Sequence, residues 1–278
     1  MDIEDTLTEN NLKKYYDFTK SFHNIYNNYP DLSFNRLINL TRNQNKEFNK
    51  LHINKMILRN AFLQMVSENL VEKDKDFLKI LIKKPQRSES GIQSISILTS
   101  PYPTWINEKG EEKKQNFSCK HNCYFCPNEI DPITRKMVMP RSYLSREPAC
   151  LRASRNEFDP IKQIYDRLTT LEKMGHPLDK LEIIVLGGTV LEYPREYLSY
   201  FTTQIFYICN VYPFIDSRPM LSLEEEQNIN MNADIRIIGY TLETRPDGID
   251  HESIHYLRSL GVTRMQIGIQ HTNNELLK

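Results

Sequence analysis

Short apolar strands alternate with amphipathic helices over most of the chain, from about residue 92 to residue 269. Strand-like runs cover 92–98, 181–186, 235–242 and 264–269, and helical patterns cover 160–174, 195–209 and 250–260. A helix between consecutive strands is typical of parallel βαβ units. The alternation predicts an α/β fold with a parallel sheet, either open or barrel-like.

Residues 1–84 differ in composition from the rest, because they are rich in Asn, Lys and Leu and contain no glycine. Apolar residues at helical spacing in 45–63 and 75–82 predict a small helical region. Between Thr41 and Asn60, five basic residues are opposed only by Glu47: Arg42, Lys46, Lys50, Lys55 and Arg59. Such a stripe can contact RNA phosphates and, more commonly, is a solvated helix face.

Cys119, Cys123 and Cys126 fall within eight residues of one another. They follow the first strand and the segment 101–116, which its prolines and Gly110 predict to be an irregular loop. The C-x3-C-x2-C spacing suits a [4Fe–4S] cluster, because three thiolates hold three irons and leave the fourth open. An open iron can chelate S-adenosylmethionine, and an electron from the cluster can break its carbon–sulfur bond. The spacing therefore favours radical S-adenosylmethionine chemistry.

Other roles for these thiols stay open. Together with His121 they could bind zinc as a Cys3His set, although ligands two residues apart are crowded. They could also remain unligated. A disulfide is disfavoured, because an odd number of clustered cysteines without a signal peptide indicates a reducing compartment. Cys150 and Cys209 lie in helical patterns and are predicted to be packing residues.

Composition fits a water-soluble enzyme without identifying one. The 36 basic and 36 acidic residues give a formal net charge of zero, so global charge carries no nucleic-acid signal. No run approaches the roughly 20 apolar residues of a membrane-spanning helix, and the acidic first residues do not resemble a targeting signal. We expect a cytoplasmic protein of one large domain or two, without a membrane partner.

Glycines stand at the carboxyl end of the second predicted strand, and this end of a parallel strand carries the active site in such folds. Gly187, Gly188 and Thr189 would let a ligand approach the backbone. Its N–H and C=O groups could hold the methionyl amino group of S-adenosylmethionine. A plain strand-to-helix turn is the alternative.

Polar side chains mark the ends of the next two strands. Glu243 and Arg245 could meet ribose hydroxyls or carboxylates of a ligand, or form a structural ion pair. Gln266 and Gln270 flank Gly268 on the last strand. Facing a barrel interior, they would either contact ligand or form hydrogen bonds in the core.

A series of short motifs runs in order through residues 80–278. They are Lys84-Pro85-x-Arg87-Ser88-x-Ser90-Gly91, Thr99-Ser100-Pro101-Tyr102-Pro103, the cysteine run, Ser142-Tyr143-Leu144 with Glu147-Pro148, Arg152-Ala153-x-Arg155-Asn156, Phe158-Asp159-Pro160, Gly175-His176-Pro177-x-Asp179-Lys180-x-Glu182, Gly187-Gly188-Thr189, Glu243-Thr244-Arg245-Pro246-Asp247 and Gly268-Ile269-Gln270. Together they resemble the radical-SAM half of the catalytic subunit of Elongator, the tRNA wobble-uridine modifying enzyme.

The resemblance implies a partial radical-SAM (β/α) barrel over 85–278, preceded by a helical region over 1–84 that corresponds to the tRNA-binding part. It implies that Cys119, Cys123 and Cys126 hold the cluster. It also implies that a 5′-deoxyadenosyl radical serves acetyl-CoA-dependent modification at carbon 5 of the wobble uridine. Other subunits of an Elongator-like assembly are implied partners.

Further residue roles follow from the same resemblance. Lys180 occupies the position of the lysine that the family associates with acetyl-CoA, with an ordinary surface lysine as the alternative. Lys84 and Arg87 are candidates for RNA phosphate contacts at the active-site entrance. The candidate catalytic residues are thus Lys180, Glu243 and Arg245, and the candidate cofactor-binding residues are Gly187, Gly188, Thr189, Lys180 and Gln266.

The chain departs from the family pattern around the cysteines. Family members commonly have a longer gap between the first two cysteines, and Cys-Pro-Gly-Gly where this chain has Asn128 and Glu129 after Cys126-Pro127. Arg141 and Ser145 replace the usual Gln and Gly around Ser142-Tyr143-Leu144. These changes predict an altered loop beside the cluster.

The family's barrel continues with further strands, a small zinc-binding segment and a GNAT-type acetyltransferase domain, whereas this sequence stops at Lys278. We therefore expect a barrel that is truncated at its C-terminus, with a separate chain as a candidate source of the acetyltransferase domain. A non-catalytic tRNA-binding fragment and a zinc-binding structural module are the alternative functions.

Overall fold

The computed structural model describes residues 9–116, 119, 121 and 123–276, and it divides into two compact units. One unit comprises the residues up to Ser90 together with Thr169–Pro177. The other comprises Gly91–Leu168 and the residues from Leu178 onward. None of the described helices combines the length and the apolar character that crossing a bilayer requires.

The first unit is helical, as predicted. Its elements are α2 (Glu9–Leu12), η1 (Lys13–Tyr15), α3 (Tyr16–Asn28), α4 (Phe34–Gln44), η2 (Lys46–Lys50), α5 (Lys55–Ser67), α6 (Lys75–Ile80) and η3 (Pro85–Ser88). Phe18, Phe22, Phe62 and Phe77 are fully buried and form the centre of its core. Burying aromatic side chains of this size stabilises a small helical unit by about 2 kcal/mol each.

The helical spacing at 45–63 corresponds to two helices, η2 and α5, rather than to one. Asn45 accepts a hydrogen bond from the Glu47 N–H and opens η2, and Asn54 accepts one from the Ile57 N–H and opens α5. Each asparagine satisfies backbone donors at a helix start, so the segment divides into two helices at these caps.

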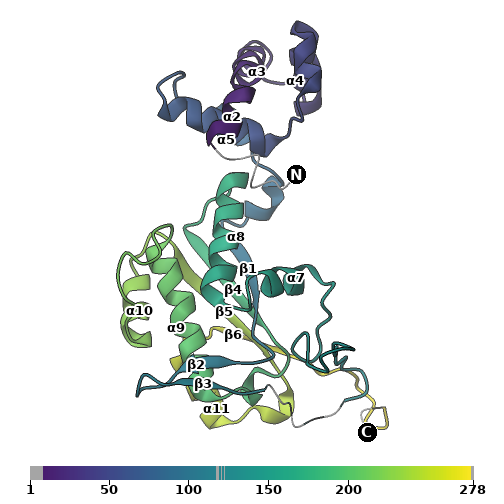
Figure 1. Cartoon of the computed structure of the whole chain (residues 1–278), viewed down its shortest axis with the longest axis vertical. Helices are drawn as coiled ribbons and strands as arrows, with labels where there is room; N and C mark the ends of the chain where they lie inside the picture. Colours follow the sequence, from purple (N-terminus) through teal and green to yellow (C-terminus); the bar gives the residue numbers. More distant parts are fainter. Residues whose placement is uncertain (1–8, 117–118, 120, 122, 277–278) are drawn as a thin grey trace. The chain divides into compact units, whose positions relative to one another are not determined.

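The second unit contains the predicted parallel sheet, with strand order β1-β4-β5-β6 and every pair parallel. The strands are β1 (Gln93–Leu98), β4 (Lys180–Leu186), β5 (Arg236–Thr244) and β6 (Arg264–Ile267). Figure 1 shows them side by side. Alternate residues of β4, among them Leu181, Ile183 and Val185, are buried, and this fixes the register of the central pair.

Helices connect and cover the strands. They are α7 (Pro148–Arg155), α8 (Pro160–Met174), α9 (Arg195–Val211), α10 (Leu223–Asn230) and α11 (His251–Ser259), with short turns η4 (Val190–Glu192) and η5 (Pro246–Gly248). Cys150 on α7 and Cys209 on α9 are buried, in the packing role that the helical patterns predicted. Burial raises the pKa of Cys150 to about 11 and of Cys209 to about 12, so both thiols stay protonated at neutral pH.

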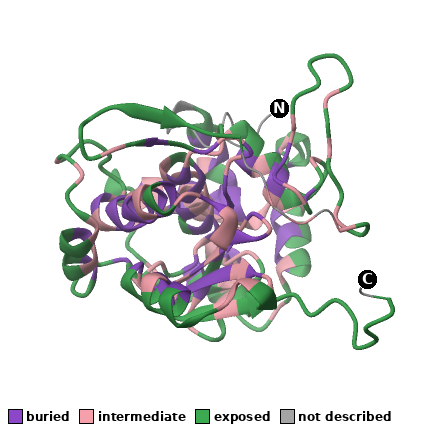
Figure 2. Ribbon diagram, turned by 90° about the horizontal axis from the view of Figure 1, so that it is seen from below, coloured by how far each residue is buried: buried purple, intermediate pink, exposed green. Residues whose placement is uncertain are grey.

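Two segments differ from the prediction. The supposed irregular loop 101–116 holds an antiparallel hairpin of β2 (Thr104–Ile106) and β3 (Glu112–Lys114). Trp105 is buried and donates through Nε1 to Glu196 of α9 (2.9 Å), so a tertiary contact holds this strand. Most of the hairpin is otherwise exposed (Figure 2).

The segment 213–232, which lies between a predicted helix and a predicted strand, contains α10, a helix that the sequence pattern did not predict. Ser222 and Glu225 form a capping box that starts it. Inside the helix, Glu226 is buried and pairs with Arg218, with Nη1–Oε1 and Nη2–Oε2 both at 2.6 Å.

Candidate functional site

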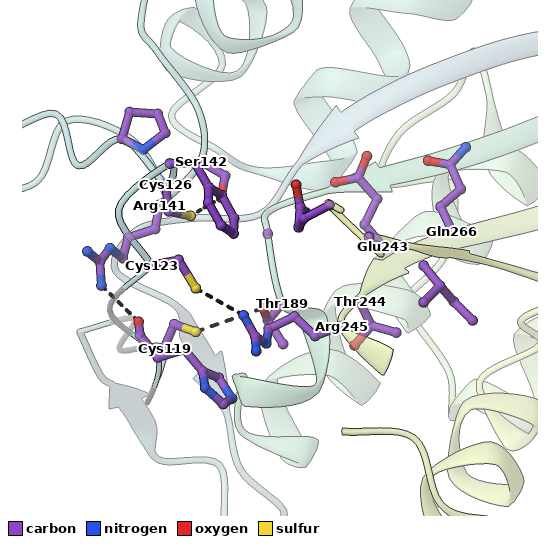
Figure 3. A pocket seen from close by; sticks show the side chains of 17 residues that line it. Cys119, Cys123, Cys126, Arg141, Ser142, Thr189, Glu243, Thr244, Arg245 and Gln266 are labelled. Atoms are coloured by element: carbon purple, nitrogen blue, oxygen red, sulfur yellow. Dashed lines mark hydrogen bonds between the residues drawn. The ribbon is translucent and has the colours of Figure 1, made fainter. Parts of the chain in front are cut away.

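A cavity of about 400 Å³ lies at the carboxyl ends of β4, β5 and β6. Predicted site residues from the cysteine loop and from three strand ends line it together: Cys119, Cys123, Cys126, Gly188, Thr189, Glu243, Arg245 and Gln266. Figure 3 shows the cysteines on one side of the cavity, with Glu243 and Gln266 on the other. Residues that are widely separated in the sequence therefore lie together at the carboxyl ends of the strands.

The three cysteines are half-buried free thiols. The Cys119 thiol donates to Thr189 Oγ1 (3.8 Å), and Cys123 Sγ accepts from Arg245 Nη1 (3.0 Å). Cys126 Sγ forms a hydrogen bond with Ser142 Oγ. Each sulfur thus has a polar partner from a different part of the second unit.

Three free thiols on one cavity are the donor set that an iron–sulfur cluster requires, so the chemistry of the residues fits the group. Across residues 9–116, 119, 121 and 123–276, no three His, Cys, Asp or Glu side chains form a preassembled metal site. Each of the three sulfur atoms instead has its own polar partner at the cavity.

Gly187 and Gly188 make the turn after β4 possible. Gly188 has a φ of 78°, and a Cβ on it would lie 3.0 Å from the Arg141 carbonyl oxygen. A Cβ on Gly187 would lie 1.9 Å from Thr99 Oγ1. Only glycine fits this close approach of the strand ends, which leaves the backbone at Gly188 open to the cavity.

Glu243 shares a hydrogen bond with Tyr143, a residue that the sequence patterns did not assign to the site. The Tyr143 hydroxyl donates to Glu243 Oε2. Burial raises the pKa of the Glu243 carboxyl above its ordinary value, while this hydrogen bond works against the shift. Burial and then the carboxylate raise the pKa of Tyr143. A half-buried carboxylate with a tyrosine donor therefore borders the cavity.

Thr244 is a second residue that sequence reasoning did not single out. Thr244 lines the cavity and is 6% exposed. Its Oγ1 has no hydrogen-bond partner within the described part of the chain. A buried unpaired hydroxyl is unfavourable, so a ligand that formed a hydrogen bond with it would remove this cost. Gln266, by contrast, is exposed on β6.

Arg245 forms an ion pair, but with Asp247 rather than with Glu243. Its Nε donates to Oδ1 (2.9 Å) and its Nη2 to Oδ2 (2.8 Å). His121 of the cysteine loop lies on the same carboxylate, with Nε2–Oδ2 at 3.3 Å. The hydrogen bonds from Arg245 hold the pKa of Asp247 below its usual range.

Glu129 and Ser145, two of the residues that depart from the family pattern, contact each other. The Glu129 carboxylate accepts from the Ser145 N–H (2.6 Å) and hydroxyl (2.7 Å). Arg141 Nη1 donates to the His121 carbonyl oxygen (3.0 Å). The loop after the cysteines is therefore fastened to the segment before α7 by side chains where the family pattern has glycines.

Lys180 is not brought to the cavity. It is the first residue of β4, whereas the cavity lies at the other end of that strand, about 20 Å away at roughly 3.3 Å per residue. Its exposed ammonium lies 3.9 Å from Asp179 Oδ2.

Lys84 and Arg87 belong to the first unit, where both are exposed. Lys84 has a φ of 56° and precedes η3, which contains Arg87. Within the basic stripe, Arg42, Lys55 and Arg59 donate to carbonyl oxygens of the same unit, with N–O distances of 3.2 to 3.4 Å. These three side chains serve the helical packing, so the stripe is only partly a free basic surface.

Comparison with known proteins gives relatives. The chain is 36% identical to the tRNA uridine(34) acetyltransferase of Methanocaldococcus infernus over 74% of this chain and 35% of that protein. It is 32% identical to the enzyme of that name from Dehalococcoides mccartyi (71% and 37%) and 32% identical to Elongator complex protein 3 of Drosophila melanogaster (70% and 33%). The chain is a distant homologue of these proteins and spans about a third of their length.

The chain was also compared with protein-family models and with solved structures. No protein-family model matches the chain. The solved structure of Methanocaldococcus infernus Elp3 with an N-terminal deletion (1–46) is similar at 27% identity and a TM-score of 0.46, over 67% of this chain and 30% of that one.

Proposed function

We propose that the chain belongs to the family of the Elongator catalytic subunit and acts as a radical-SAM part of a tRNA wobble-uridine modifying enzyme. One observation carries the proposal. Three free cysteines in radical-SAM spacing line the same cavity as the glycine turn and the polar strand ends. The homology to tRNA uridine(34) acetyltransferases supports tRNA uridine as the substrate.

Cys119, Cys123 and Cys126 would hold a [4Fe–4S] cluster in this proposal. When bound, that cluster supplies the electron that cleaves S-adenosylmethionine to a 5′-deoxyadenosyl radical. The chain's own residues would bind and orient the ligands. The open backbone at Gly188 and Thr189 would accept hydrogen bonds from the methionyl amino group and donate hydrogen bonds to the methionyl carboxylate.

Glu243, Thr244 and Gln266 lie across the cavity from the cysteines and would hold the adenosyl part. The Glu243 carboxylate suits ribose hydroxyls, because it accepts hydrogen bonds and the Tyr143 donor fixes its orientation. The unpaired hydroxyl of Thr244 and the exposed amide of Gln266 add donors and acceptors on the same wall.

Three further assignments rest on the sequence resemblance. Lys180 would contact acetyl-CoA, the proposed co-substrate, from the amino end of β4. Lys84 and Arg87 would contact tRNA phosphates, together with the remaining exposed basic residues of the first unit. A chain carrying an acetyltransferase domain, or other Elongator-like subunits, would complete the assembly.

Anaerobic reconstitution with iron and sulfide, followed by an assay for 5′-deoxyadenosine from S-adenosylmethionine, tests the proposal. Wild type should form the product, and Cys123→Ala should form none. No product from a reconstituted wild type would refute catalysis. tRNA binding without iron or product would then favour a non-catalytic tRNA-binding fragment.

A further inference from the structure

Arg245 is held in one orientation by two parallel hydrogen bonds to Asp247. The Nε–Oδ1 and Nη2–Oδ2 distances are 2.9 and 2.8 Å, so the planar guanidinium is fixed by a carboxylate on its own turn. Pro246 between them opens η5 and restrains the backbone that joins the two side chains. Asp247, rather than any sulfur, therefore sets the direction of the guanidinium.

The remaining nitrogen of that guanidinium meets a cysteine. Nη1 donates to Cys123 Sγ at 3.0 Å, as the dashed line in Figure 3 shows. The side chain of Arg245 is 30% exposed, so much of its charge faces protein rather than water. His121, two residues before Cys123, lies 3.3 Å from the same Asp247 carboxylate. The segment after β5 thus contacts the cysteine loop at two residues, Cys123 through Arg245 and His121 through Asp247.

The three cysteines differ in the charge of their partners. Cys119 contacts the Thr189 hydroxyl and Cys126 the Ser142 hydroxyl, which are neutral groups. Cys123 accepts instead from a cation. Hydrogen bonds and positive charge at a cluster sulfur stabilise the reduced cluster, which carries one more negative charge, and therefore raise its reduction potential.

We propose that Arg245 is a positioning residue for the cluster, which holds Cys123 in place and raises the reduction potential of the cluster through the Nη1–Sγ hydrogen bond. The inference deepens the proposed function and rests on it. In this inference Asp247 orients Arg245, and Arg245 contacts Cys123 instead of the ribose.

The test compares Arg245→Gln with Arg264→Gln as a matched control. Arg264 is on the neighbouring strand β6, where it pairs with Glu182 (2.6 Å), outside the cavity lining. Iron and sulfide content and the midpoint potential, from a redox titration followed by electron paramagnetic resonance, are measured on the reconstituted full chain. Arg245→Gln should shift the potential to a more negative value, and Arg264→Gln should not.

Two further variants separate positioning from a general structural role. Arg245→Lys keeps the charge and should recover part of the shift. Asp247→Asn should move the potential in the same direction as Arg245→Gln, because the guanidinium loses its fixed orientation. If Arg245→Gln does not hold a cluster, the cluster content of the other two variants decides. A cluster retained in Arg245→Lys supports positioning. A cluster lost from both Arg245 variants but retained in Asp247→Asn opposes the role of the Asp247 pair.

The failures of the two proposals are distinguishable. A wild type without iron and sulfide overturns the proposed function, and this inference with it. A wild type that holds the cluster, with Arg245→Gln at the same potential, overturns this inference alone.

Discussion

Replacing Thr244 by valine should stabilise the free protein while weakening its binding of S-adenosylmethionine. Valine keeps the branched shape of threonine and exchanges the hydroxyl for a methyl group. Thr244 is 6% exposed, and its Oγ1 has no hydrogen-bond partner among the described residues. In the ligand-free state the hydroxyl is therefore desolvated without compensation.

The size of both effects follows from that geometry. A buried unpaired hydroxyl costs about 1–3 kcal/mol, so its removal should raise the free energy of unfolding by about 1 kcal/mol. A hydrogen bond to the bound ligand is worth about 0.5–1.5 kcal/mol, so its loss should raise the dissociation constant roughly 2- to 12-fold. Thr244→Val should therefore increase the stability of the free chain and decrease its affinity for S-adenosylmethionine.

The assays are urea unfolding of the ligand-free chain and equilibrium binding of S-adenosylmethionine to the reconstituted chain. Thr202→Val is the control, because Thr202 is also buried but its hydroxyl is paired with the Tyr240 hydroxyl at 2.9 Å. It should destabilise the chain and leave binding unchanged. A Thr244→Val chain that is destabilised like the control, or that binds with wild-type affinity, would refute the reasoning.

Other sites give further expectations. Gly188→Ala should lower the affinity for S-adenosylmethionine at least tenfold and destabilise the turn by about 1–2 kcal/mol, because the φ of Gly188 is 78° and the Arg141 oxygen would lie 3.0 Å from the new Cβ. Calorimetry would measure the affinity, and a wild-type value would contradict this expectation. Arg218→Met should cost about 2 kcal/mol at pH 7 in urea unfolding, less than a fully buried pair, because the Arg218 side chain is 27% exposed. Burial raises the pKa of Glu226, yet hydrogen bonds from Arg218, the Leu221 N–H and Asn210 lower it overall, so its contribution is present above its unfolded pKa of about 4.3 and fades as pH falls below it. The difference between wild type and Arg218→Met should therefore shrink below about pH 4, and a pH-independent difference would count against the pair. Glu129→Ala should speed loss of iron from the reconstituted chain, because the hydrogen bonds to Ser145 at 2.6 and 2.7 Å disappear, whereas Glu111→Ala on the exposed hairpin should not.

The sheet and the position of the site could be predicted from the sequence because they depend on local patterns. Each strand is an apolar run that ends at glycine or at polar residues, and parallel strands place those ends at one edge. The capping box at Ser222 and Glu225 was also visible in the sequence, and it would have indicated α10.

Other features depend on contacts that no local pattern encodes. Tyr143 meets Glu243 across 100 residues, and Arg245 meets Cys123 across 122. The strand at Trp105 depends on Glu196 of α9. Lys180 shows the converse: a motif match suggested a catalytic role, yet the strand direction places it at the edge opposite the cavity.

The central claim is that Cys119, Cys123 and Cys126 together hold an iron–sulfur cluster. Iron, inorganic sulfide and zinc should be measured per chain after anaerobic reconstitution, in wild type and in a Cys119→Ser, Cys123→Ser, Cys126→Ser triple variant. We expect about four iron and four sulfide per wild-type chain and none in the variant. One zinc per chain without sulfide, or equal iron in both proteins, would contradict the claim.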